Sequence, residues 1–120
     1  RWLPQGTSAA ALSRAPALTY SDKDSLQADW LARACGPAFP FPTHRMASSQ
    51  AFVDAALAGL GWGMNPAPLI AAHLASGALV ELIPDTPLDV ALHWQFTRRA
   101  APVLAPLTRA LRDAARATLL

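Results

Sequence analysis

Two short polar stretches, YSDKD and SS, contain side chains whose polar groups are capable of chemistry. In the first, Asp22 and Asp24 offer carboxylates that can pair with an ammonium or guanidinium group, and partial burial strengthens such a pair. In the second, Ser48 and Ser49 precede a helical pattern, so their hydroxyls can orient polar groups of a ligand. A helix start also attracts carboxylates, because its free N–H groups and the positive end of its dipole point outward.

The same residues have a purely structural explanation. Asp24, with Gln27 three residues later, resembles a capping box, in which side chains at both positions satisfy N–H groups of the first helical turn. Ser49 can act in the same way for the next helix, and each such N-cap is worth about 1 kcal/mol. A cap and a ligand contact can be the same residue, so both explanations stay open.

Short strands alternating with helices must position these stretches. The patterns predict a weak helical turn in 1–14 and strands over 17–20, 43–47, 61–65, 79–83 and 88–96. They predict helices that begin at Asp24, at the Ser pair, at Pro68 and at Pro102. This β-α-β-α-β-α-β-β-α order is typical of an α/β fold. Ligands of such sheets bind at the carboxyl ends of strands, against helix N-termini. The Ser pair is therefore the first candidate for a binding site.

The last two elements carry clear apolar patterns. Residues 88–96 alternate between apolar and polar side chains, which predicts a half-exposed strand, antiparallel to its neighbours. In the final helix, one apolar face is expected to point inward: Val103, Leu107, Ala110, Leu111 and Ala114. Pro106 is tolerable there only if it lies in the first turn.

Composition limits the kinds of protein that this chain can be. The 120 residues are 52% apolar but only 15% charged, against roughly 25% in an average soluble domain, so we expect some apolar surface to be covered by another part. Because the chain begins with Arg1, we expect a piece of a longer protein. The net charge of +2 is too small to predict nucleic-acid binding, and no apolar run reaches the ~20 residues of a membrane span.

The chemistry-bearing residues give little support to a metal site or an active site. Cys35 is the only cysteine, which fits a reducing cytoplasm, and the three histidines are far apart in the sequence, so no metal and no cofactor is predicted. The sequence contains no nucleophile-elbow context for a Ser/His/Asp set and no carboxylate pair placed for acid–base catalysis. We therefore predict that the protein is not an enzyme.

Four phrases, in this order and spacing, resemble a known family: YSDKDSLQADWL, ASSQAFVDAALAGLGWGMNP, HLASGALVEL and ALHWQF. They are similar to the effector-binding domain of LysR-type transcriptional regulators, in particular the ArgP-like branch that responds to lysine and arginine. The resemblance covers nearly the whole chain. It implies a type 2 periplasmic-binding-protein fold, in which two α/β lobes enclose the effector.

The resemblance also implies the site and the domain arrangement. Residues 1–84 would form most of the second lobe, and residues 85–120 would supply a return strand and the C-terminal helix of the first lobe. The effector contacts would be Tyr20, Ser21, Asp22, Lys23, Asp24, Ser48, Ser49, Met64 and Pro66.

The implied function is that of an effector-sensing fragment of a cytoplasmic regulator. The regulator would be a homo-oligomer without a membrane part, and it would bind DNA through an N-terminal helix-turn-helix that this chain does not contain. An alternative from another class is the solute-binding module of a transporter with the same fold. Upstream sequence would distinguish the two, because a charged-then-apolar leader is typical of the transporter component.

Overall fold

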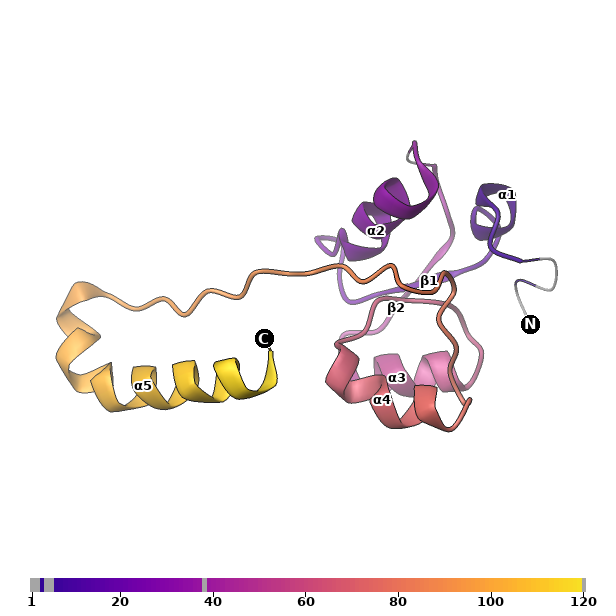
Figure 1. Ribbon diagram of the computed structural model, residues 1–120. Coiled ribbons are helices and arrows are strands. Elements are labelled where there is room, and N and C mark those ends of the chain that lie inside the picture. Colours follow the sequence, from indigo (N-terminus) through magenta and orange to yellow (C-terminus); the bar gives the residue numbers. More distant parts are fainter. Residues whose placement is uncertain (1–2, 4–5, 38, 120) are drawn as a thin grey trace. The chain divides into compact units, whose positions relative to one another are not determined.

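A computed structural model describes residues 3, 6–37 and 39–119 of the chain (Figure 1). The chain divides into two compact units, Arg1–Leu88 and Asp89–Leu120. The first unit contains both strands and helices, whereas the regular structure described in the second is helical.

A short parallel sheet lies at the centre of the first unit. Strand β1 (Ala17–Thr19) pairs with β2 (Thr43–Arg45), with Ala17 opposite Thr43 and Thr19 opposite Arg45. On its other edge, β1 meets Trp62 in a parallel bridge, where the Leu18 N–H donates to the Trp62 carbonyl (2.6 Å). The strands predicted over 17–20 and 43–47 are therefore confirmed, whereas the one predicted over 61–65 is reduced to this single bridge.

Helices cover both faces of this sheet. Successive residues of a strand point to opposite faces, so β1 presents one apolar side chain to each layer of helices. Ala17 belongs to a buried cluster with Trp30 and Leu31 of α2 (Leu26–Cys35), which also includes Trp62. Leu18 belongs to a second cluster with Phe52 and Ala55 of α3 (Ser49–Leu57). Figure 1 shows α2 and α3 on opposite sides of the strand pair. One three-residue strand thus connects two small cores.

The helices of the first unit begin and end close to the predicted positions. The weak turn near the N-terminus is α1 (Ala9–Leu12), and the helix predicted from Pro68 is α4 (Ala67–Ala75). Gly36 ends α2 with φ of 90°, a conformation that glycine adopts without a Cβ clash. The capping box predicted for Asp24 and Gln27 is wrong, because the Gln27 side chain is only 1% exposed and faces the core instead of the helix start.

The strand predicted over 79–83 is absent from the part of the chain that the structure describes. Leu82 and Ile83 are instead half-buried against the cluster around Trp30. The Trp30 indole N–H donates to the carbonyl of Thr86 (2.9 Å), which ties this segment to α2. Both edges of β1 are already occupied, by β2 and by Trp62. The apolar segment 79–83 therefore packs as a loop and pairs with neither edge.

The second unit contains one long helix and an extended segment. The helix, α5 (Ala101–Thr118), confirms the helix predicted from Pro102 and follows a single 3₁₀ turn, Arg98–Ala100. Pro106 lies inside α5, beyond its first turn, so the expectation for this residue is corrected. The segment 89–97 forms no strand, because no partner strand exists among the described residues of its unit.

The apolar side chains of the second unit are exposed, contrary to the expectation that they face inward. Val103 on α5 is 82% exposed and Leu107 47% exposed. Val90 and Leu92 on the extended segment are exposed as well. The alternating pattern and the apolar helix face are thus both present, and neither is covered within this unit.

Candidate functional site

The predicted site residues follow three chain segments that run in the same direction. Strand β1 leads into residues 20–24, β2 leads into the Ser pair, and the Trp62 bridge leads into Met64 and Pro66. Neighbouring parallel strands have their carboxyl ends on the same side of a sheet. The three turns therefore all begin at the carboxyl-terminal edge of this sheet. The N–H of Met46 donates to the Thr19 carbonyl (2.8 Å) and joins the first two turns where the strands end.

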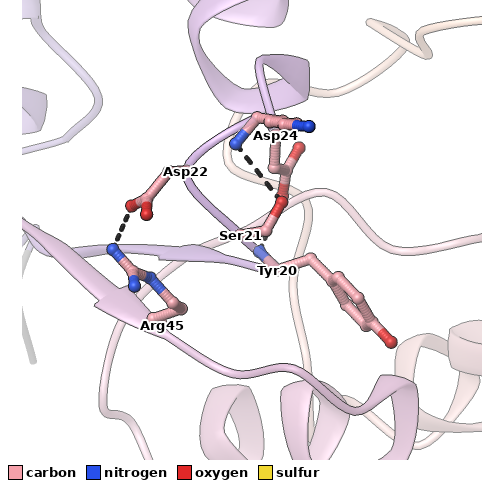
Figure 2. A network of polar contacts seen from close by, with 6 residues as sticks. Tyr20, Ser21, Asp22, Asp24 and Arg45 are labelled. Atoms are coloured by element: carbon pink, nitrogen blue, oxygen red, sulfur yellow. Dashed lines mark hydrogen bonds and ion pairs between the residues drawn. The ribbon is translucent and has the colours of Figure 1, made fainter.

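Asp24 holds the first of these turns together (Figure 2). Its Oδ2 accepts from the backbone N–H of Tyr20 (2.8 Å), and its Oδ1 accepts from the N–H of Leu26 at the start of α2 (3.1 Å). The Ser25 hydroxyl, at the N-cap position, donates to Asp29 Oδ2 (2.7 Å) instead of accepting from the helix. Asp24 is therefore the residue that satisfies the helix start, and its carboxylate is already used by the protein.

Asp22 is the carboxylate that faces solvent. Its side chain is 77% exposed and forms an ion pair with the guanidinium of Arg45, which is 60% exposed (Figure 2). Within the described ranges, this pair is the one interaction of the Asp22 carboxylate. The two acids that the sequence offered as equivalents thus differ: Asp24 is structural, and Asp22 is available at the surface.

Sequence reasoning missed Arg45. It is the last residue of β2 and lies opposite Thr19. Thr19 in turn precedes Asp22 by three residues in the sequence. The available signal was a lone basic residue at the predicted carboxyl end of one strand, together with an acidic turn after another strand. That signal needs the pairing of β1 with β2, which the sequence alone did not establish.

The second turn leads into α3 through the Ser pair. The Ser48 hydroxyl accepts from the Ala51 N–H (3.4 Å), and the Ser48 carbonyl accepts from the Phe52 N–H (2.9 Å). Ser48 is therefore the N-cap, and Ser49 is the first residue of the helix, so the suggestion that Ser49 is the cap is corrected. Both serines are exposed. The hydroxyl of Ser49 has no partner among the residues described, and it remains accessible to a ligand.

The remaining predicted residues differ in their surroundings. Tyr20 and Lys23 are exposed, and Figure 2 shows the Tyr20 ring directed away from the Asp22–Arg45 pair. Ser21 supports the turn, because its hydroxyl accepts from the Lys23 N–H (3.3 Å). Met64 is half-buried against the core cluster around Trp62.

Pro66 is the residue that precedes α4, and its side chain is exposed. It therefore fixes the chain direction after the Trp62 bridge, because its ring restricts the backbone. An open depression of about 440 Å³ lies elsewhere, within the second unit, between Phe96 and the polar face of α5. None of the predicted effector contacts lines this depression.

No helix in the described portion of the chain is long and apolar enough to cross a membrane. Over the same residues, no group of three His, Cys, Asp or Glu side chains is arranged to hold a metal ion.

Comparisons with known proteins agree on one family. Residues 3–120 match the model of the LysR substrate binding domain. The chain is 51% identical to a LysR family protein from Agrobacterium tumefaciens whose C-terminal domains have been solved, with a TM-score of 0.96 over 100% of this chain and 58% of that one. It is 40% identical to the HTH-type transcriptional regulator ArgP of Pseudomonas fluorescens, over 92% of this chain and 37% of that regulator.

A third relative has been solved with an effector. Full-length LysG from Corynebacterium glutamicum, with bound effector Arg, is 33% identical, with a TM-score of 0.72 over 89% of this chain and 36% of that chain. The chain thus spans well under half the length of the regulators ArgP and LysG. ArgP is an HTH-type transcriptional regulator, and the resemblance to the LysR type and its ArgP-like branch is confirmed. The chain belongs to the LysR substrate-binding domain family and has the periplasmic-binding-protein-like fold of that family.

Proposed function

We propose that this chain is the effector-sensing part of a LysR-type transcriptional regulator and that its effector is a basic amino acid, lysine or arginine. The effector would bind at the edge where β1 and β2 end. The observation that carries the proposal is the exposed Asp22 carboxylate at this edge, in a chain similar to a regulator solved with bound effector Arg. A cationic side chain requires such an acceptor, because an unpaired charge is costly to desolvate.

The two ends of a basic amino acid match two features of the edge. The ammonium or guanidinium group of the side chain would pair with Asp22. The α-carboxylate would lie against the start of α3, where the free hydroxyl of Ser49 and the first N–H groups of the helix are donors. Tyr20, whose ring is directed away from Asp22, would contact a part of the effector other than its cationic group. Ser21, Asp24 and Ser48 would hold the two turns in position. Lys23, Met64 and Pro66 would border the site.

We further propose that residues 1–84 belong to the second lobe of a two-lobed domain and that residues 85–120 return to the first. The division of the chain into units between Leu88 and Asp89 falls near this boundary and supports the assignment. The exposed apolar faces of α5 and of residues 89–97 support it as well, because surfaces of this kind normally have a partner. The first lobe would cover both and complete the effector cleft.

The proposed mechanism is a population shift. An effector can change the regulator only if it binds one arrangement of the lobes more tightly than the other. The full-length protein would be a cytoplasmic homo-oligomer that binds DNA through a helix-turn-helix outside this chain. ArgP is itself an HTH-type regulator, which supports this part of the proposal.

Isothermal titration calorimetry on the full-length regulator tests the proposal. Lysine, arginine, the neutral arginine analogue citrulline and glutamate would be titrated into the wild-type protein and into the Asp22→Asn variant. We expect binding of lysine or arginine, and at least a tenfold loss of affinity in Asp22→Asn, whereas the matched control Asp89→Asn in the second unit should bind normally. If none of the amino acids gives a heat of binding, the proposed effector class is refuted. If Asp22→Asn binds lysine and arginine as tightly as the wild type does, the role of Asp22 is refuted.

A further inference from the structure

The ion pair between Asp22 and Arg45 joins the ends of two neighbouring strands at the candidate site (Figure 2). It is a contact between the turn after β1 and the last residue of β2, and both side chains are well exposed. The pair is not needed to align the strands, because Thr19 and Met46 already form a backbone hydrogen bond there. Its place at the edge therefore calls for an explanation other than sheet pairing.

We propose that Arg45 is an internal competitor for the effector: its guanidinium occupies the carboxylate that a basic ligand must reach. This inference rests on the proposed function. The two carboxylates of the turn are not interchangeable, because both oxygens of Asp24 accept backbone N–H groups, from Tyr20 and Leu26. Asp22 is thus the one acid of the turn that can exchange its partner. Arg45 pairs with Oδ1 of Asp22, so a guanidinium or ammonium group of the ligand either displaces Arg45 or binds beside its like charge, and both weaken binding.

The same arrangement predicts which ligands have a lower affinity because of Arg45. A basic side chain has to displace Arg45 or approach its positive charge, so its binding free energy is reduced by up to the strength of the Asp22–Arg45 pair. A neutral isostere has no charge for Asp22 and leaves the pair intact. Arg45 therefore lowers the affinity for basic ligands selectively and keeps the effector threshold high. Since exposed ion pairs are weak, the effect on the dissociation constant is about two- to fivefold.

An opposite role for Arg45 is the obvious competing explanation. If its guanidinium bound the ligand's α-carboxylate directly, removing it would weaken binding. The start of α3 argues against this role, because Ser49 and the helix N–H groups already offer donors to a carboxylate. Agmatine, which is arginine without its carboxylate, separates the two roles. Loss of a competitor improves the binding of arginine and agmatine alike, whereas loss of a carboxylate anchor harms arginine alone.

The test compares the full-length wild-type regulator with its Arg45→Gln variant by calorimetry, using arginine, agmatine and citrulline as probes. We expect the dissociation constants of arginine and agmatine to fall about two- to fivefold in the variant and that of citrulline to stay unchanged. Arg14→Gln, at an exposed arginine of the same unit, is the matched control for the change in net charge and should leave all three constants unchanged. Arg45→Lys keeps the charge and should lie close to the wild type.

An unchanged or increased dissociation constant for arginine in Arg45→Gln would overturn the inference, while wild-type binding of arginine would leave the proposed function standing. Binding of arginine by the variant alone would support the competitor and refute the proposed effector for the natural protein. If neither protein binds arginine or agmatine, the inference falls. If the wild type also fails to bind lysine in the first titration, the proposed function falls with it.

Discussion

Replacing Asp24 by Ala should destabilise the protein far more than replacing Asp22 by Ala. The Asp24 carboxylate accepts two backbone hydrogen bonds, at 2.8 and 3.1 Å, that hold the turn and start α2. Hydrogen bonds to a charged group contribute about 1.5 kcal/mol or more each, and we reduce their sum to about 2 kcal/mol because the turn is half open to water. The Asp22→Ala substitution removes only an exposed ion pair, which contributes about 0–1 kcal/mol to the free energy of unfolding.

Urea unfolding of the full-length regulator, followed by circular dichroism, measures the difference. With a denaturant slope of about 2 kcal/mol per molar urea, the Asp24→Ala midpoint should fall by about 1 M, and the Asp22→Ala midpoint by less than half of that. Asp24→Asn is the matched control, because its remaining amide oxygen can still accept one of the two N–H groups and should recover about half of the loss. Calorimetry with arginine should rank the same variants in the opposite order, with Asp22→Ala the more damaging to binding.

Equal midpoints for the two alanine variants would refute this reasoning. They would mean that the backbone hydrogen bonds to Asp24 are replaced by water at little cost, so that the structural role of this residue is wrong. A larger loss of stability in Asp22→Ala would assign the structural role to the ion pair instead, and it would weaken the inference about Arg45.

Three further predictions concern packing and capping. Replacing Ser48 by Ala removes the acceptor for the Ala51 N–H and should cost about 1 kcal/mol, measured as a lower Tm. Replacing Gly63 by Ala places a Cβ 2.5 Å from Cε1 and 2.8 Å from Cζ of the buried Phe52 ring, so we expect a loss of about 1–3 kcal/mol in urea unfolding. Replacing Leu107 by Gln should destabilise the full-length regulator by about 2 kcal/mol in thermal unfolding if the first lobe covers α5.

Each of these variants has a control on the same chain. Ser49→Ala should change Tm little, because Ser49 makes no cap bond among the described residues. Gly77→Ala meets no neighbour within 4 Å and should show only the cost of its φ of 74°, about 1 kcal/mol. Arg112→Gln changes the polar face of α5 and should be tolerated. A control that costs as much as its partner variant would show that the named contact is not the cause.

Local signals predicted most of the helices correctly. The Ser pair marks the start of α3, because a hydroxyl before an apolar helical period satisfies the first turn, and Ser48 does so. Gly36 marks the end of α2 because its φ of 90° suits a residue without a Cβ. Such signals depend on neighbours within one or two turns, and these neighbours are adjacent in the sequence.

Strand pairing and the site needed information that the sequence does not carry locally. Alternation along 88–96 favours an extended backbone, but a ladder also needs a partner edge, and the second unit offers none among its described residues. In the same way, Asp22 and Asp24 look alike in the sequence, although one accepts backbone N–H groups and the other faces Arg45. Arg45 was missed because its role depends on a parallel pairing between distant segments.

The three-segment sheet also bears on the speed with which this protein folds. Strand β1 begins at Ala17 and pairs with Thr43, 26 residues later (43 − 17), and with Trp62, 45 residues later (62 − 17). Both chain loops must close before the cluster around Trp30 is complete, because Trp62 belongs to it, and closure entropy opposes each step. The backbone of helix α5, by contrast, is held by local hydrogen bonds and can form within microseconds. On a ribosome, the cluster around Trp30 would therefore stay incomplete until Trp62 has emerged, and its apolar side chains would be exposed until then.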